Sequence, residues 1–169
     1  MKRPEGAASA NPRLRVVDME TDGVAAEVLY PDRGLGFFSL EPDLQESVFA
    51  HYNDWLADFC KDYPKRLFGI AAIPCYDIGK AIKELHRTHD MGLHGCLIWE
   101  VPDPKLPFHS PHYERLWGAA AELGAPINIH ILTGFGYHMN RKKGIEHVRG
   151  TVNHKTNDTI NSLFDVIWS

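Results

Sequence analysis

The sequence contains no apolar run that approaches the length of about 18 residues needed to cross a membrane. Its first twelve residues are polar and small, without the apolar core of a secretory signal. The three cysteines, Cys60, Cys75 and Cys96, form no Cys-x-x-Cys pair, which argues against a disulfide framework and against a zinc knuckle. These absences predict a cytoplasmic protein without a membrane partner.

Positive charge and phosphate-binding loops are also scarce. The net charge is −4 and the pI is near 6.2. The one basic run, residues 141–143, is too short for a nucleic-acid surface. The segment Gly34-Leu35-Gly36 lacks the third glycine and the Lys-Ser/Thr ending of a phosphate loop. We therefore expect no nucleic-acid partner.

What is present is an alternation of apolar strands and amphipathic helices after a flexible lead-in over residues 1–11. A length of 169 residues suits one domain with a substantial core. The pattern predicts a parallel sheet covered by helices, which is either a small doubly wound sheet or half of a (βα)8 barrel of about 250 residues. The predicted strands are 25–30, 67–73, 93–99 and 126–132, and the predicted helices are 12–22, 41–62, 77–91, 113–123 and a last one from 156; residues 32–40 and 133–155 are predicted loops.

The most informative residue is His130, near the end of the last predicted strand. Side chains alternate along a strand, so Asn128, His130 and Leu132 share one face. A polar group near the carboxyl end of a buried strand is costly unless it is hydrogen-bonded or bound to a ligand, and that end is where α/β proteins bind ligands. His130 is therefore a candidate ligand, and a hydrogen-bonded structural histidine is the alternative.

Two further side chains, Tyr30 and Trp99, lie at the carboxyl ends of their predicted strands. Trp99 could stack on an aromatic substrate. Arg141, in the loop after His130, could pair with a substrate carboxylate. Packing and solvent exposure are the alternatives for all three residues, and no catalytic residue is assigned.

Several segments resemble the amidohydrolase-related family of metal-dependent enzymes, which includes the aminocarboxymuconate-semialdehyde decarboxylase group. The resemblance covers nearly the whole chain, in order and with fitting spacing. It rests on Asp22–Pro31, Tyr52–Leu56, Arg66–Pro74, Ala81–Leu85, Gly92–Gly95, Tyr113–Trp117, Glu122–Pro126 and Ile129-His130.

This resemblance implies a partial TIM (βα)8 barrel that contains strands two to five, with the metal at the carboxyl-terminal mouth. His130 matches the ligand of the fifth strand. The family's His-x-His pair on the first strand has no counterpart in this sequence, nor have its later histidine and aspartate. Zinc is the expected metal, and manganese or iron would also suit a His/Asp site.

We expect residues 12–169 to be a single domain truncated at both ends. It would be a fragment of a metal-dependent hydrolase or non-oxidative decarboxylase that acts on a small, carboxylated cyclic substrate, and it would be inactive alone. The alternative is a non-catalytic α/β module that self-associates into a homo-oligomer through exposed sheet edges.

Overall fold

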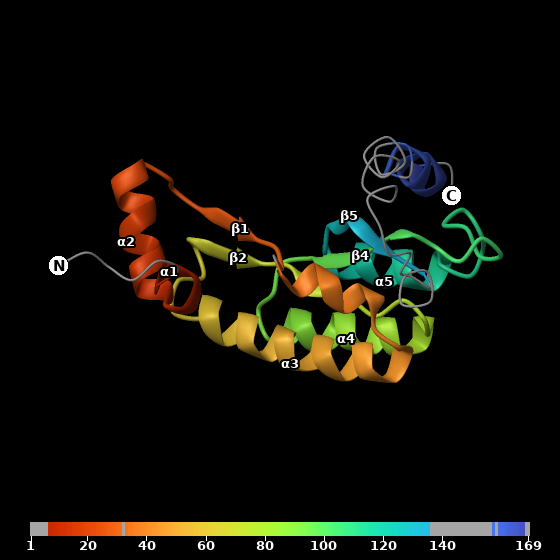
Figure 1. Cartoon of the computed structure of the whole chain (residues 1–169), viewed down its shortest axis with the longest axis horizontal. Helices are drawn as coiled ribbons and strands as arrows, with labels where there is room; N and C mark the ends of the chain where they lie inside the picture. Colours follow the sequence, from red (N-terminus) through yellow and green to blue (C-terminus); the bar gives the residue numbers. More distant parts are fainter. Residues whose placement is uncertain (1–6, 32, 136–156, 158, 168–169) are drawn as a thin grey trace, which may run out of the picture.

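The computed structural model describes residues 7–31, 33–135, 157 and 159–167. Within these ranges, five helices, five short strands and one 3-10 helix alternate along the chain, and residues 159–167 form a further helix (Figure 1). The elements are α1 (Ala7–Ala10), α2 (Pro12–Asp22), β1 (Glu27–Leu29), η1 (Arg33–Ser39), α3 (Pro42–Cys60), β2 (Leu67–Gly69), β3 (Ala71–Ala72), α4 (Ile78–Asp90), β4 (Cys96–Val101), α5 (Glu114–Leu123) and β5 (Ile127–Gly134).

All strand pairs are parallel. β1 pairs with β2, and β3, β4 and β5 pair in that order. The two groups meet at Ile70, whose backbone N–H donates to Leu29 O at 3.1 Å, while the next N–H, of Ala71, donates to Gly95 O at 2.9 Å. The sheet therefore runs β1, β2/β3, β4, β5, as the βαβ pattern of the sequence predicts.

The predicted strand 67–73 is split at Ile70, because β1 ends beside β2 and does not continue along β3. The side chain of Asn53, on α3, takes the vacant place. It accepts a hydrogen bond from Ala72 N at 2.9 Å and donates to Ala72 O at 3.0 Å. Its amide also donates to Glu84 Oε1 at 2.8 Å, which ties α3 and α4 to the same point.

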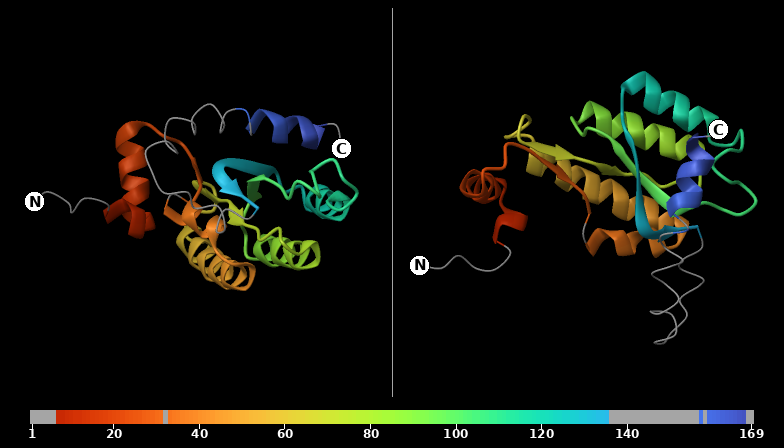
Figure 2. Two further views of the ribbon diagram at one scale, coloured as in Figure 1. Left: turned by 45° about the vertical axis from the view of Figure 1, so that its right-hand side comes forward. Right: turned by 90° about the horizontal axis from the view of Figure 1, so that it is seen from above.

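α3, α4 and α5 lie side by side against one face of the sheet (Figure 2). Their buried apolar residues include Leu56, Leu85 and Leu116. Helix α4 begins as the sequence predicts, with the Asp77 side chain accepting a hydrogen bond from Lys80 N at 3.0 Å. The side of Gly69 facing these helices has no room for a Cβ, which would lie 2.8 Å from Leu93 Cδ2, so this glycine lets strand and helix layer approach closely.

Two further sequence predictions fail in detail. The predicted loop 32–40 contains η1, which is held because Phe38 is buried against the ring of Phe49, with centroids 4.6 Å apart. The strand predicted at 93–99 begins only at Cys96, because Leu93 N still bonds the carbonyl of Thr88 at the end of α4.

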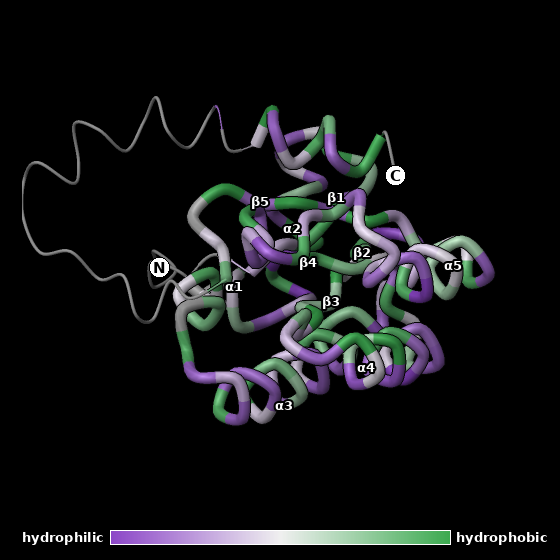
Figure 3. Tube along the Cα trace, turned by 90° about the vertical axis from the view of Figure 1, so that its right-hand side faces the viewer, coloured by the Kyte–Doolittle hydropathy of each residue, from purple (hydrophilic) through white to green (hydrophobic). Residues whose placement is uncertain are grey.

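The helix at residues 159–167 lies on the other side of the strands from α3 and α4 (Figure 3). It is held by polar contacts to buried Glu100: Thr159 Oγ1 donates to the carboxylate, and Ser162 Oγ donates to the backbone carbonyl. No helix in the described ranges combines the length and apolarity needed to cross a bilayer.

Candidate functional site

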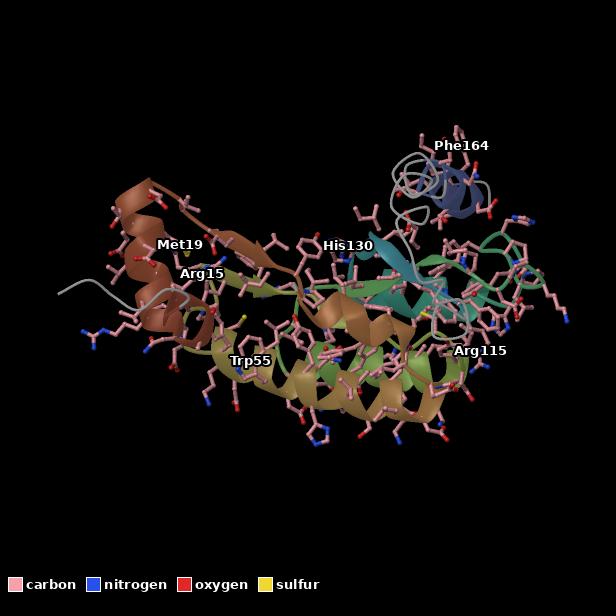
Figure 4. The ribbon with its side chains drawn as sticks, in the orientation of Figure 1. Arg15, Met19, Trp55, Arg115, His130 and Phe164 are labelled. Atoms are coloured by element: carbon pink, nitrogen blue, oxygen red, sulfur yellow. The ribbon has the colours of Figure 1, made fainter. Side chains whose placement is uncertain are left out.

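His130 lies on β5, half-buried, near the point where β5 approaches the end of β1 (Figure 4). Its Nδ1 is 2.8 Å from the carbonyl oxygen of Ile131. A carbonyl only accepts hydrogen bonds, so Nδ1 is the donor in this pair, and in the neutral form of the ring the lone pair lies on Nε2. A backbone carbonyl that fixes Nδ1 in this way is a common support for a histidine that binds metal through Nε2.

Tyr30 reaches this histidine from the opposite edge of the sheet. Its ring centroid is 6.3 Å from that of His130, and its hydroxyl donates to Asn128 Oδ1 at 2.6 Å. The amide of Asn128 in turn donates to Cys96 O and Pro126 O, both at 3.1 Å. The strand formed by β2 and β3, and then β4, lie between β1 and β5 in the sheet. The contact between Tyr30 and the side chains of β5 therefore requires a strongly curved sheet, and these side chains meet across its concave face.

Thr133 fixes the backbone around His130. Its hydroxyl donates to His130 O at 2.7 Å and accepts from Glu100 N at 2.7 Å. This bond replaces a ladder bond at the register shift between Trp99 and Val101. The strand that carries His130 is thus locked to β4 at the carboxyl end of the sheet.

Trp99 pairs in register with His130 but is 1% exposed. Its ring meets Tyr76 and Phe135 edge-on, with centroids 4.8 and 5.8 Å away. Together they form an aromatic cluster to which β4 contributes Trp99, the turn between β3 and α4 contributes Tyr76, and the residue after β5 contributes Phe135. Arg141, the third predicted substrate contact, lies outside the described residues.

The described residues alone do not form a metal site. Nowhere in those ranges do three or more His, Cys, Asp or Glu side chains cluster, and His130 is a single donor. The thiols near the sheet are poor ligands, because burial raises the pKa of Cys75 and raises that of Cys96 to about 12. A catalytic zinc site needs about three protein ligands, so no chemical step is assigned to a metal held by these residues.

The sequence profile of the amidohydrolase family matches residues 5–149. The chain belongs to this family. The sequence resemblance is thereby confirmed. No curated protein matches the chain.

Solved structures of this family share the fold. The 2,6-dihydroxybenzoate decarboxylase from Rhizobium superposes with a TM-score of 0.68 at 21% identity, over 90% of this chain and 49% of the other. The 5-carboxyvanillate decarboxylase from Novosphingobium aromaticivorans, with bound manganese, gives 0.71 at 21% identity, over 99% and 49%. The dihydroxybenzoic acid decarboxylase from Polaromonas, with manganese and 2-nitroresorcinol, gives 0.67 at 20% identity, over 91% and 48%.

This family member therefore spans about half the length of the structures that it resembles. Those neighbours are TIM-barrel amidohydrolases, so the predicted fold class, a partial (βα)8 barrel, is confirmed, and the doubly wound alternative is not supported.

Of the predicted site residues, the structure brings Tyr30 and His130 together. It places Trp99 beside His130 in the sheet, but buried against the rings of Tyr76 and Phe135. Sequence reasoning missed the roles of Asn128 and Thr133. The signal for Asn128 was present, because it is a polar residue two positions before His130 on the same face of an apolar strand. The sequence contained no signal for Thr133, since the role of this residue depends on the register shift between β4 and β5.

Proposed function

We propose that this chain is part of a metal-dependent enzyme that removes carbon dioxide, without oxidation, from a small carboxylated aromatic compound. The observation that carries the proposal is the placement of His130 on β5 of a half barrel, with Nδ1 bonded to Ile131 O and Nε2 left for a ligand. The similarity to three decarboxylases of the family supports this choice of reaction. Hydrolysis of an amide, ester or lactone is the competing reaction within the family, whose matched profile is described as amidohydrolase.

In this proposal His130 is one ligand of a divalent metal, and the other ligands come from outside the described residues. When bound, the metal would polarise a substrate or water oxygen. Manganese is present in two of the similar decarboxylases. Histidine also suits zinc and iron, so the proposal is a divalent metal, with zinc against manganese to be decided by measurement.

The proposed substrate contacts are Tyr30, Trp99 and Arg141. Tyr30 is 44% exposed, and its hydroxyl can exchange the Asn128 acceptor for a substrate oxygen. Trp99 would contact a substrate after Phe135 moves aside, because that ring covers it. Arg141 would pair with the carboxylate. We also infer a cytoplasmic location, because all three cysteines are free and buried, as expected in a reducing compartment.

The test is metal binding measured by calorimetry with Mn²⁺ and Zn²⁺ on the purified chain, a His130→Ala variant and a His86→Ala control whose side chain is exposed on α4. The proposal expects weak binding that His130→Ala abolishes and His86→Ala retains. Equal binding by all three proteins would overturn the assignment of His130.

Activity requires a separate test, because we propose that this half barrel is inactive alone. The genomic DNA on both sides is to be sequenced and any in-frame extension expressed. Loss of 2,6-dihydroxybenzoate or 5-carboxyvanillate absorbance with the extended protein plus Mn²⁺, and not with the chain alone, is the expected result. Hydrolysis of amide or lactone substrates without decarboxylation would replace the proposal with the competing reaction.

The second candidate is a non-catalytic module that self-associates. Among the described residues β1 pairs with β2 alone, and this edge position in the sheet favours self-association. Stop codons directly flanking the chain would support this alternative over the enzyme fragment.

A further inference from the structure

The polar side chains on the concave face of the sheet form a hydrogen-bond chain that runs in one direction. The amide nitrogen of Asn128 donates to the carbonyl oxygens of Cys96 and Pro126, both at 3.1 Å. Because a carbonyl only accepts, these two bonds occupy both protons of the amide and fix its orientation. The Asn128 Oδ1 atom is therefore the end of the amide that faces Tyr30.

Tyr30 continues this chain toward the site. Asn128 Oδ1 can only accept, so the Tyr30 hydroxyl donates its one proton to it, at 2.6 Å. The phenolic oxygen of Tyr30 then has lone pairs but no proton for a ligand. As long as the bond to Asn128 persists, Tyr30 meets a ligand as a hydrogen-bond acceptor.

His130 has the same polarity. Its ring centroid lies 6.3 Å from that of Tyr30, and its Nδ1 donates to Ile131 O, so the neutral ring presents a lone pair at Nε2. In the proposed function a metal takes this lone pair, and the neutral oxygen of Tyr30 is left for an O–H or N–H donor. A carboxylate offers only acceptors and would find no proton at either atom.

We propose that Tyr30, oriented by Asn128, is a specificity-determining residue that recognises a protonated hydroxyl group on the ring of the substrate. The substrate hydroxyl donates to Tyr30 Oη, and the substrate carboxylate points away from Tyr30. Asn128 acts through Tyr30 and is a positioning residue. This inference rests on the proposed function for the carboxylated ring, and it adds the hydroxyl group and the orientation of the ring.

The opposite arrangement, in which Tyr30 leaves Asn128 and donates to a substrate oxygen, is less favourable. Asn128 precedes His130 by two residues on the same face of β5, so its Oδ1 would be covered by the ligand without the proton that it accepts. An unpaired desolvated acceptor costs more than one hydrogen bond returns. A substrate that brings its own donor keeps the bond between Tyr30 and Asn128 and adds another.

The first test is an NMR titration of the 15N-labelled chain with the β5 amides as the readout. The ligands are 3-hydroxybenzoate, 3-methoxybenzoate, which has the oxygen without the proton, and benzoate, which has neither. The proposal expects 3-hydroxybenzoate to bind about fivefold more tightly than the other two, the effect of about one net hydrogen bond. Equal affinity for all three ligands, or no binding of any, would overturn it.

Two variants assign this preference to its residues. Tyr30→Phe should bring the affinities for 3-hydroxybenzoate and benzoate within about twofold of each other, because the acceptor is gone. Asn128→Leu releases the proton of Tyr30, so 3-methoxybenzoate should bind about fivefold more tightly than it binds the unmodified chain. Tyr63→Phe, in the turn between α3 and β2, is the matched control and should keep the original preference.

A purely structural role of Asn128 would instead weaken the binding of all three ligands alike in Asn128→Leu, and this result would overturn its role as a positioning residue. An unchanged hydroxyl preference in Tyr30→Phe would overturn the role of Tyr30.

This inference and the proposed function fail separately. Metal binding that is unaffected by His130→Ala, together with an intact hydroxyl preference, would overturn the proposed metal ligand and leave the recognition of an aromatic hydroxyl by Tyr30. Metal binding that depends on His130, together with equal affinity for the three ligands, would overturn this inference alone.

Discussion

The central strands and the edge strands of this sheet have different environments. β3 and all but the last residue of β4 are buried, whereas β1 and residues 127–131 of β5 are half-buried or exposed. The centre is covered by the row α3, α4 and α5 on one face and by aromatic rings near the mouth. We expect the centre of the sheet to contribute most of the stability of the fold, whereas the edge strands carry Tyr30, Asn128 and His130, among them the residues of the proposed site.

The strongest test of this contrast is an apolar truncation at the centre. Ile98→Ala removes a fully buried side chain from β4, and we expect it to lower the free energy of unfolding by about 2–5 kcal/mol. Val28→Ala, on the exposed edge strand, should change it by less than about 0.5 kcal/mol at concentrations where the chain is monomeric. Urea denaturation measures both, and similar losses would remove the distinction between centre and edge.

Truncation of a polar side chain should also destabilise the protein more at the centre of the sheet than at its edge, with smaller losses than for the apolar truncation. Asn53→Ala leaves the N–H and C=O of Ala72 buried and unpaired, so we expect a loss of about 2–3 kcal/mol. Asn128→Ala removes hydrogen bonds from a half-buried position and should cost about 0.5–1.5 kcal/mol. Urea denaturation measures both losses. A larger loss for Asn128→Ala than for Asn53→Ala would contradict the expectation that the centre of the sheet contributes more stability than its edges.

Alkaline pH should destabilise the fold through the buried thiols near the centre of the sheet. Burial raises the pKa of Cys75, and raises that of Cys96 to about 12. Above about pH 9 the unfolded chain releases thiol protons that the folded chain retains, so the free energy of unfolding should fall as the pH rises toward 12. The slope is at most about 1.4 kcal/mol per pH unit for each thiol. Denaturation at pH 8, 9 and 10 measures it, and a Cys75→Ala/Cys96→Ala variant should show a shallower slope.

The smallest expected effect concerns the contact across the concave face. Tyr30→Phe removes the hydroxyl that donates to Asn128, and because Tyr30 is exposed we expect a loss of about 0.5 kcal/mol. A double-mutant cycle with Asn128→Ala isolates the contact, and a coupling energy near zero would show that the bond adds nothing to stability.

Local chemistry allowed much of the fold to be predicted. The helix predicted at residues 12–22 has the same bounds as α2, because Pro12 suits its first turn and Gly23 adopts the left-handed conformation at φ 72° after its end. Gly124 ends α5 in the same way, at φ 62°. The split of the strand at Ile70 was not predictable, because it depends on where β1 ends and on Asn53, a residue 17 positions away along the chain.

The candidate site shows the same difference between features that a local sequence pattern predicts and features that depend on distant residues. His130 was identified from its position in an apolar strand, a local pattern. Its contact with Tyr30 depends on the curvature of the whole sheet, which no local pattern specifies. The aromatic cover over Trp99 likewise depends on Tyr76 and Phe135, which come from segments that follow two other strands.

The replacement of a strand by Asn53 has a consequence for motion. Backbone bonds at Ile70 and from His94 N to Gly69 O join β1 and β2 to the rest of the sheet, and beside β3 the side chain of Asn53 stands where a strand would continue, so the hydrogen-bond ladder is interrupted there. Sub-global opening of a protein follows such boundaries. Native-state amide exchange should therefore show β1 and β2 opening as one unit while the amides of β4 stay protected, and loss of Asn53 should widen the gap between the two exchange rates.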